Sequence, residues 1–118
     1  MSDSEIARDR WAEALTDFSR TYEGRLASFE VLGPELGVQP EVRNLPLLGV
    51  SADRPEQDPS IAISVARSTT VHLTHVIREV QRVILEHDAE NDTAALLIES
   101  QDGTRTILQV HAAHGEHR

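Results

Sequence analysis

The chain has 118 residues, enough for one domain, and 31 of them are Leu, Ile, Val or Phe, which can build a core. Acidic residues outnumber basic ones by 20 to 11, and the resulting formal charge of -9 repels nucleic-acid backbones and anionic membranes. Every basic residue is Arg and Cys is absent, which excludes lysine Schiff bases, thiol catalysis and cysteine-ligated metal sites.

The N-terminus gives no sign of export or of membrane insertion. Its first residues are acidic, whereas a signal peptide needs positive charge followed by an unbroken apolar stretch. No window of the chain approaches the roughly 20 consecutive apolar residues that cross a bilayer. We therefore expect a cytoplasmic protein that binds neither membranes nor nucleic acid and that folds as a single domain over residues 1–118.

Residues 4–20 are predicted to form an amphipathic N-terminal helix. Apolar side chains recur on one helix face at Trp11, Ala14, Leu15 and Phe18. Ser2 and Glu5 have the spacing of a capping box, and Asp9 is the alternative cap of a shorter helix. The stripe predicts that the helix packs against the core.

Residues 22–111 are predicted to form an antiparallel sheet. Alternating or apolar runs, separated by turns that contain Gly or Pro, predict short strands at residues 25–32, 37–42, 44–52 and 61–65. Pro40 lacks a backbone donor, so we expect either that the second of these strands lies at an edge or that Pro40 stands near the start of a strand. Residues 53–60 have the composition of a loop.

The strongest local signal is the Asp-Gly dipeptide at residues 102–103, which favours a two-residue type I′ turn. Such a turn predicts the cross-strand pairs Ile98–Ile107, Leu97–Leu108 and Ser100–Arg105. Aliphatic side chains would then occupy both faces of the hairpin. We expect it to be a central element that is covered on two sides.

Residues 71–87 fit two different structures. Apolar residues recur at helical spacing, which favours one helix. The segment is also rich in β-branched residues and fits two strands, at residues 71–77 and 81–87. The pattern alone leaves both open.

Five blocks in the sequence resemble a family of small bacterial proteins catalogued only as a domain of unknown function. They are F-S-R-x-x-E-G at residues 18–24, E-V-L-G-P-E-L-G at 30–37, L-P-L-L-G-V-S-A-D at 45–53, T-H-V-I at 74–77 and L-I-E-S-Q-D-G-T at 97–104. Members of that family usually carry a proline near the position of Val80, which suits a strand-turn-strand and would break a helix. The resemblance therefore implies two strands in residues 71–87, although this chain has Val80 itself. It implies no activity, substrate or cofactor.

Histidines are the candidate metal ligands, because neutral imidazole binds zinc, nickel or copper. Two groups stand out, the pair His72 and His75 and the set His111, His114 and His117. The pair could chelate an ion from a helix, whereas residues three apart in a strand face opposite sides. The last three lie at or in a tail, residues 112–118, that we expect to be flexible.

The sequence contains no enzyme signature, and we predict no catalytic residue, no cofactor-binding residue and no cofactor. The predicted fold is α+β, with the helix packed on a curled antiparallel sheet of five to seven short strands, a small roll or partly open barrel. We expect a non-enzymatic interaction or assembly module, a homodimer or a partner of another protein, because small sheets often pair their edges. The alternatives are a metal- or small-ligand-binding protein that uses the histidines and a small enzyme with an unrecognised pocket.

Overall fold

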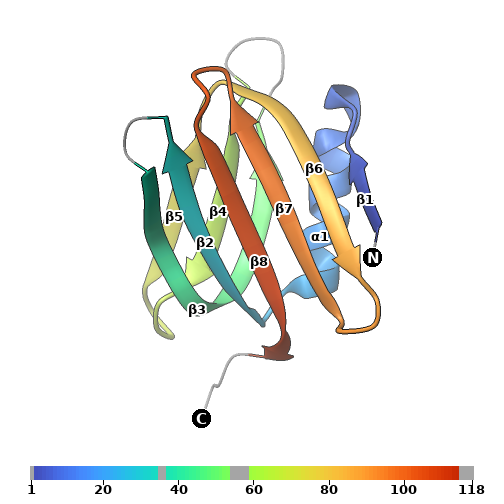
Figure 1. Ribbon diagram of the computed structural model, residues 1–118. Helices are drawn as coiled ribbons and strands as arrows, with labels where there is room; N and C mark the ends of the chain where they lie inside the picture. Colours follow the sequence, from blue (N-terminus) through green and yellow to red (C-terminus); the bar gives the residue numbers. More distant parts are fainter. Residues whose placement is uncertain (1, 35–36, 54–58, 115–118) are drawn as a thin grey trace.

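The computed structural model describes residues 2–34, 37–53 and 59–114. These residues form one α-helix, a short 3-10 turn and eight strands (Figure 1). In chain order they are β1 (Ser2–Glu5), η1 (Arg8–Arg10), α1 (Trp11–Tyr22), β2 (Arg25–Gly33), β3 (Gly37–Ala52), β4 (Ile61–Ala66), β5 (His72–Ile77), β6 (Val80–Asp88), β7 (Thr93–Ser100) and β8 (Arg105–His114). The α+β class is confirmed, but the sheet has more strands than the predicted five to seven.

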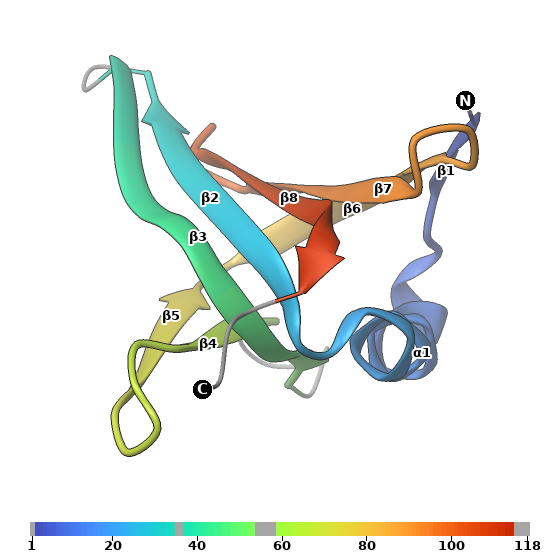
Figure 2. The ribbon, with the colours of Figure 1, turned by 90° about the horizontal axis from the view of Figure 1, so that it is seen from below.

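The strands form one antiparallel sheet in the order β1-β6-β7-β8-β2-β3-β4-β5. The sheet is curled and stays open. In Figure 1, β6, β7, β8 and β2 make a front layer, while β4, β5 and α1 lie behind it. Figure 2 shows that the part of the sheet with β6, β7 and β8 is inclined to the part with β3, β4 and β5, and that α1 lies beneath β6 and β7 in this view. The described part of the chain has no helix that is long and apolar enough to cross a membrane.

The sheet curls along β3, because this strand of 16 residues pairs with different strands in its first and second parts. Residues 37–46 pair with β2, and residues 47–52 pair with β4. The register shifts between Ala27 and Phe29 of β2, and Asn44 on β3 adopts a left-handed φ of 53°. Such irregularities bend a strand and increase its twist. The prediction of two separate strands, at residues 37–42 and 44–52, was therefore wrong, since one bent strand spans both.

The core fills the space between the two layers. Helix α1 contributes the buried side chains Trp11, Leu15 and Phe18 of the predicted apolar stripe, whose Ala14 is half-buried, and adds Tyr22. Facing them are the fully buried side chains Leu47, Ile61, Ile63, Val65, Val80, Val83, Leu96, Ile98, Leu108 and Val110. On β4, the buried Ile61, Ile63 and Val65 alternate with half-buried neighbours, which confirms the strand predicted at residues 61–65.

The N-terminal limit of the predicted helix, residue 4, was wrong. Ser2–Glu5 forms β1 and pairs with β6. The helix begins only at Trp11, and its N-cap Arg10 makes no side-chain capping hydrogen bond, so neither Ser2 nor Asp9 caps it. Residues 2–5 contain no apolar side chain to bury, whereas the edge of β6 offers backbone partners.

Ser19 joins α1 to β3 beyond the residues of β3 that pair with β2. Its Oγ accepts a hydrogen bond from the Val50 N–H at 2.8 Å, and its one O–H is shared between the carbonyl oxygens of Val50 at 2.9 Å and Leu15 at 2.8 Å. Both backbone groups of Val50 are thus satisfied by one side chain. The helix takes the place of a strand beside residues 47–52 of β3.

The β7–β8 hairpin forms as predicted, but its register differs by one residue. Leu97 pairs with Ile107 and Leu96 with Leu108, in place of the predicted Ile98–Ile107 and Leu97–Leu108 pairs. This register places the buried residues Leu96, Ile98, Thr106 and Leu108 on one face. Leu97 and Ile107 on the other face are only half-buried. The prediction that the hairpin is covered on both faces was therefore also wrong.

The turn explains the change of register. A type I′ turn needs positive φ at both central residues, yet of the two only Gly103 has it. The Asp102 carboxylate instead accepts a hydrogen bond from the Thr104 N–H at 3.0 Å, which lowers the pKa of Asp102. The Ser100 N–H donates to the Thr104 carbonyl oxygen at 2.8 Å, closing a longer loop.

Residues 71–87 form two strands, β5 and β6, as the family resemblance implied. Only Arg78 and Glu79 separate them, and Glu79 has a left-handed φ of 51°. The buried Val80 then donates its N–H to the Pro59 carbonyl oxygen at 2.8 Å. This link carries the chain from β5, at one end of the sheet order, to β6, which lies next to the strand at the other end, and it can be so short because the sheet is curled.

The Ser19→Ala substitution should destabilise the protein by about 1–3 kcal/mol, because it leaves two backbone groups of Val50 without their partner. Thr21→Ala is the matched control, since the Thr21 hydroxyl donates to Asp17 on the exposed side of the same helix. We expect the control to change stability by less than about 0.5 kcal/mol. Urea denaturation measures both, and equal losses would contradict the bridging role of Ser19.

Candidate functional site

Strand β5 is one end of the sheet, and it pairs with β4 alone among the described strands. Two hydrogen bonds identify which of its backbone groups point outward. Asp53 N–H donates to the Ser60 oxygen, and Arg67 N–H donates to the Val71 oxygen. The first bond shows that Ser60, and with it every second residue of β4, faces β3, so the residues between them face β5. The second bond shows that Val71 faces β4. Residues 73, 75 and 77 therefore face β4 as well, because alternate residues of an antiparallel strand bond to the same side. Residues 72, 74 and 76 direct their N–H and C=O groups away from the sheet.

The side chains of β5 leave this edge open. Residues 71–77 contain no Asp, Glu, Lys, Arg or Pro. Val71 and Val76 are 46% and 48% exposed, and Val38 on β3 is the only other large apolar residue so exposed in the described ranges. His72 and Thr74 are exposed as well.

The other two edges carry the features that usually prevent strand pairing. Strand β1 has four residues, of which Asp3 and Glu5 are acidic. Residues 37–46 of β3, which pair only with β2, contain Pro40, Glu41 and Arg43. Short length, charge and proline all discourage the addition of another strand. Within the described chain, β5 is thus the one edge without such protection, and the expectation that Pro40 lies at an edge is confirmed.

The structure separates the predicted histidine pair. His72 is exposed on the outer face of β5, whereas His75 is half-buried on the inner face, with its ring centroid 5.2 Å from that of Phe29. The two imidazoles cannot share one ion. The described residues contain no cluster of three His, Asp or Glu that could hold a metal.

Of the C-terminal histidines, His111 lies on β8 and is half-buried. The side chain of His114 and the whole of His117 lie outside the described residues, as do most of the predicted tail and residues 54–58 of the predicted loop. A metal role for this group stays a prediction.

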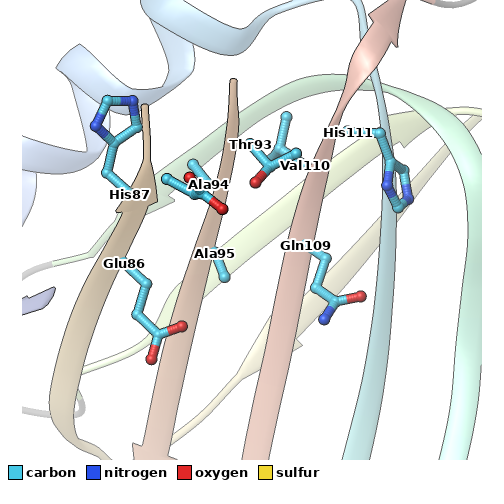
Figure 3. A pocket seen from close by; sticks show the side chains of 9 residues that line it. Glu86, His87, Thr93, Ala94, Ala95, Gln109, Val110 and His111 are labelled. Atoms are coloured by element: carbon cyan, nitrogen blue, oxygen red, sulfur yellow. The ribbon is translucent and has the colours of Figure 1, made fainter. Parts of the chain in front are cut away.

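A polar trough crosses the outer face of the sheet. One depression of about 290 Å³ lies over β6, β7 and β8, where Glu86, Ala95 and Gln109 form a row across the strands (Figure 3). A second depression of about 260 Å³ lies over β2 and β3. Gln109 and His111 line both, so the two adjoin. At the far end, hydrogen bonds from the side chain and backbone of Asn91 lower the pKa of Asp88.

Ser28 and His111 lie in contact in this trough. The distance from Ser28 Oγ to His111 Nε2 is 3.2 Å, and Ser28 Oγ also accepts a hydrogen bond from the Asn44 N–H at 2.9 Å. A serine nucleophile needs a histidine that is itself oriented by a third group. Within the described chain, no carboxylate lies at hydrogen-bonding distance from His111. The contact therefore supports the irregular backbone at Asn44 more readily than it supports acyl transfer.

Comparison with known proteins agrees with the resemblance seen in the sequence. Residues 2–115 match the family of unknown function DUF5335. The chain belongs to this family. A relative, an uncharacterized protein of Aquifex aeolicus (strain VF5), is 29% identical over 113 residues, which make up 96% of each chain. No solved structure matches the chain. The family thus places the chain among bacterial proteins without assigning it an activity.

Neither the open edge nor the trough was among the predicted sites. The absence of charge and proline in residues 71–77 was visible in the sequence. Their place at the end of the sheet was not, because it depends on the curl of β3. The Ser28–His111 contact joins residues 83 positions apart and has no local signal.

Ser28→Ala should lower the free energy of unfolding by about 0.5–1.5 kcal/mol, since the Asn44 N–H loses its acceptor where the backbone is strained. His111→Ala removes only the second contact of that hydroxyl, so we expect a smaller loss. Urea denaturation at neutral pH compares the two variants. A larger loss for His111→Ala would contradict the structural role given to Ser28.

Proposed function

We propose that the protein is a non-enzymatic interaction or assembly module of the bacterial cytoplasm, which binds another polypeptide by adding a strand to the edge of β5. The observation that carries this proposal is the single unprotected edge among the described strands. Strand addition needs a row of outward backbone donors and acceptors, and residues 72, 74 and 76 supply three of each.

The side chains at this edge define the chemistry of the partner. The outer face presents His72, Thr74 and Val76, which are uncharged or weakly basic and are exposed. A partner strand with β-branched and small polar residues would pack on them, because such residues form favourable cross-strand pairs. The exposed valine side chains would lose contact with water on binding, which favours association.

The edge is also firmly held. Opposite β5, the side chains Ile61, Ile63 and Val65 of β4 are fully buried. Thr74 Oγ1 lies 3.0 Å from Ser64 Oγ across the two strands. A rigid strand loses little conformational freedom when a partner pairs with it, which lowers the entropic cost of binding.

Thr74→Pro should abolish binding while leaving the sheet folded, since Thr74 directs its N–H away from β4 and no native ladder bond depends on it. Thr74→Val is the matched control, because it keeps the N–H and the β-branched shape. The probe is a fluorescent peptide carrying residues 71–77 between solubilising charged residues. Fluorescence anisotropy should show at least about tenfold weaker binding to the proline variant, which corresponds to about 1.4 kcal/mol.

Circular dichroism and thermal unfolding show whether the proline variant keeps its sheet. Equal affinity of the folded proline variant and the valine variant for the peptide would contradict strand addition at β5. A loss of binding in the valine variant alone would place the recognition in the Thr74 hydroxyl and would contradict the backbone mechanism.

A further inference from the structure

We infer that the strand added to β5 is the β5 of a second copy of this chain, paired antiparallel about a twofold axis at Thr74. This inference rests on the proposed function and names its partner. It follows from the direction of the backbone groups, from the side chains that the pairing brings together and from the distribution of charge.

The backbone fixes the register. Two outward-facing residues must lie opposite each other to exchange both hydrogen bonds. With the axis at Thr74, this residue faces its own copy, and His72 faces Val76 on both sides of the axis. All outward N–H and C=O groups of residues 72, 74 and 76 are then used, which gives six hydrogen bonds. A shift of the axis to position 73 or 75 takes one of these residues out of the strand pairing.

The side chains agree with this register. On the outer face, the pairing covers the exposed Val76 with the ring of His72, and it places two threonines side by side, a favourable cross-strand pair. On the inner face, Leu73 lies opposite His75 of the second copy. Both residues are half-buried on the core side of β5, so the second strand extends the existing apolar surface.

Charge explains why the contact is made here. Two copies with a formal charge of -9 each repel one another unless their acidic surfaces stay apart. Residues 71–77 carry no acidic group and are flanked by Arg67 and Arg78. Arg67 bonds to Val71 on the β4 side of the strand, so in this register it lies level with Ile77 of the second copy and one strand away from the contact. No two like charges are opposed along the pairing.

Cysteine cross-linking tests the register directly, because the chain has no cysteine of its own. In a pair that exchanges both hydrogen bonds, the Cα atoms are about 5.5 Å apart, within the range of a disulfide. Thr74→Cys should therefore form a disulfide-linked dimer on mild oxidation. Single His72→Cys and Val76→Cys variants should stay largely monomeric on a non-reducing gel, since each cysteine lies about 13 Å along the strand from its own copy.

The double variant His72→Cys/Val76→Cys completes the test, because it places a cysteine opposite a cysteine on both sides of the axis. We expect it to cross-link as Thr74→Cys does, at least about tenfold faster than either single variant. Sedimentation of the cysteine-free chain should show a dimer, with Thr74→Pro a monomer and Thr74→Val a dimer.

Equal cross-linking of all three single variants, or a monomeric wild-type chain, would overturn the pairing of two copies. Binding of the 71–77 peptide that still depends on the Thr74 N–H would then leave strand addition to β5 standing, because it would show that the edge accepts a free strand although two folded chains do not pair. Preferential cross-linking of His72→Cys or Val76→Cys alone would also overturn the register, because it moves the axis away from Thr74. The two proposals thus fail by different readouts.

Discussion

The fold depends on how β3 changes its neighbour. Over residues 37–46 it pairs with β2, and beyond that point β4 takes one side while Ser19 of α1 satisfies the other. A regular strand of this length would keep β2 beside it and extend a flat sheet. The left-handed Asn44 and the register shifts turn the chain instead, so that β4 and β5 pass behind the front layer and enclose the core.

The same curl leaves the sheet open at β5. Closure would need β5 to reach β1, but the two-residue link at Arg78 and Glu79 sends the chain directly into β6, which pairs with β7 and β1. One edge is then left with its backbone groups outward. The short acidic β1 and the proline-containing part of β3 are edges as well, and their residues oppose pairing. The contrast between these edges and β5 is the reason to place an interaction surface there.

The trough on the outer face is a different kind of feature. Its one serine–histidine contact lies beside the strained Asn44, whose N–H donates to the same serine. A side chain that supports an irregular backbone explains this arrangement without a ligand. Further along strands β6, β7 and β8, Arg82, Glu99 and Arg105 form a charged row that is paired across the strands. Both features stabilise the sheet that presents β5.

Local patterns predicted the elements whose buried residues recur at a regular spacing in the sequence. The stripe from Trp11 to Phe18 gave the helix, and Ile61, Ile63 and Val65 gave β4. The predictions that were wrong concern features that depend on contacts outside the local sequence. The start of the helix is decided by the pairing of residues 2–5 with β6. The hairpin register is set by the longer turn at residues 101–103, and it brings Leu96 and Leu108 to the buried face. For the same reason the sequence could show that residues 71–77 lack charge, but not that they end the sheet.

Amide hydrogen exchange, followed residue by residue by NMR at low and high protein concentration, tests the central claim most directly. The N–H groups of Leu73 and His75 point to β4 and should be protected at both concentrations. Those of His72, Thr74 and Val76 should exchange fast in dilute protein and become protected as its concentration rises. Rates for these three amides that do not change with concentration, in a well-folded chain, would contradict the pairing of two copies at β5.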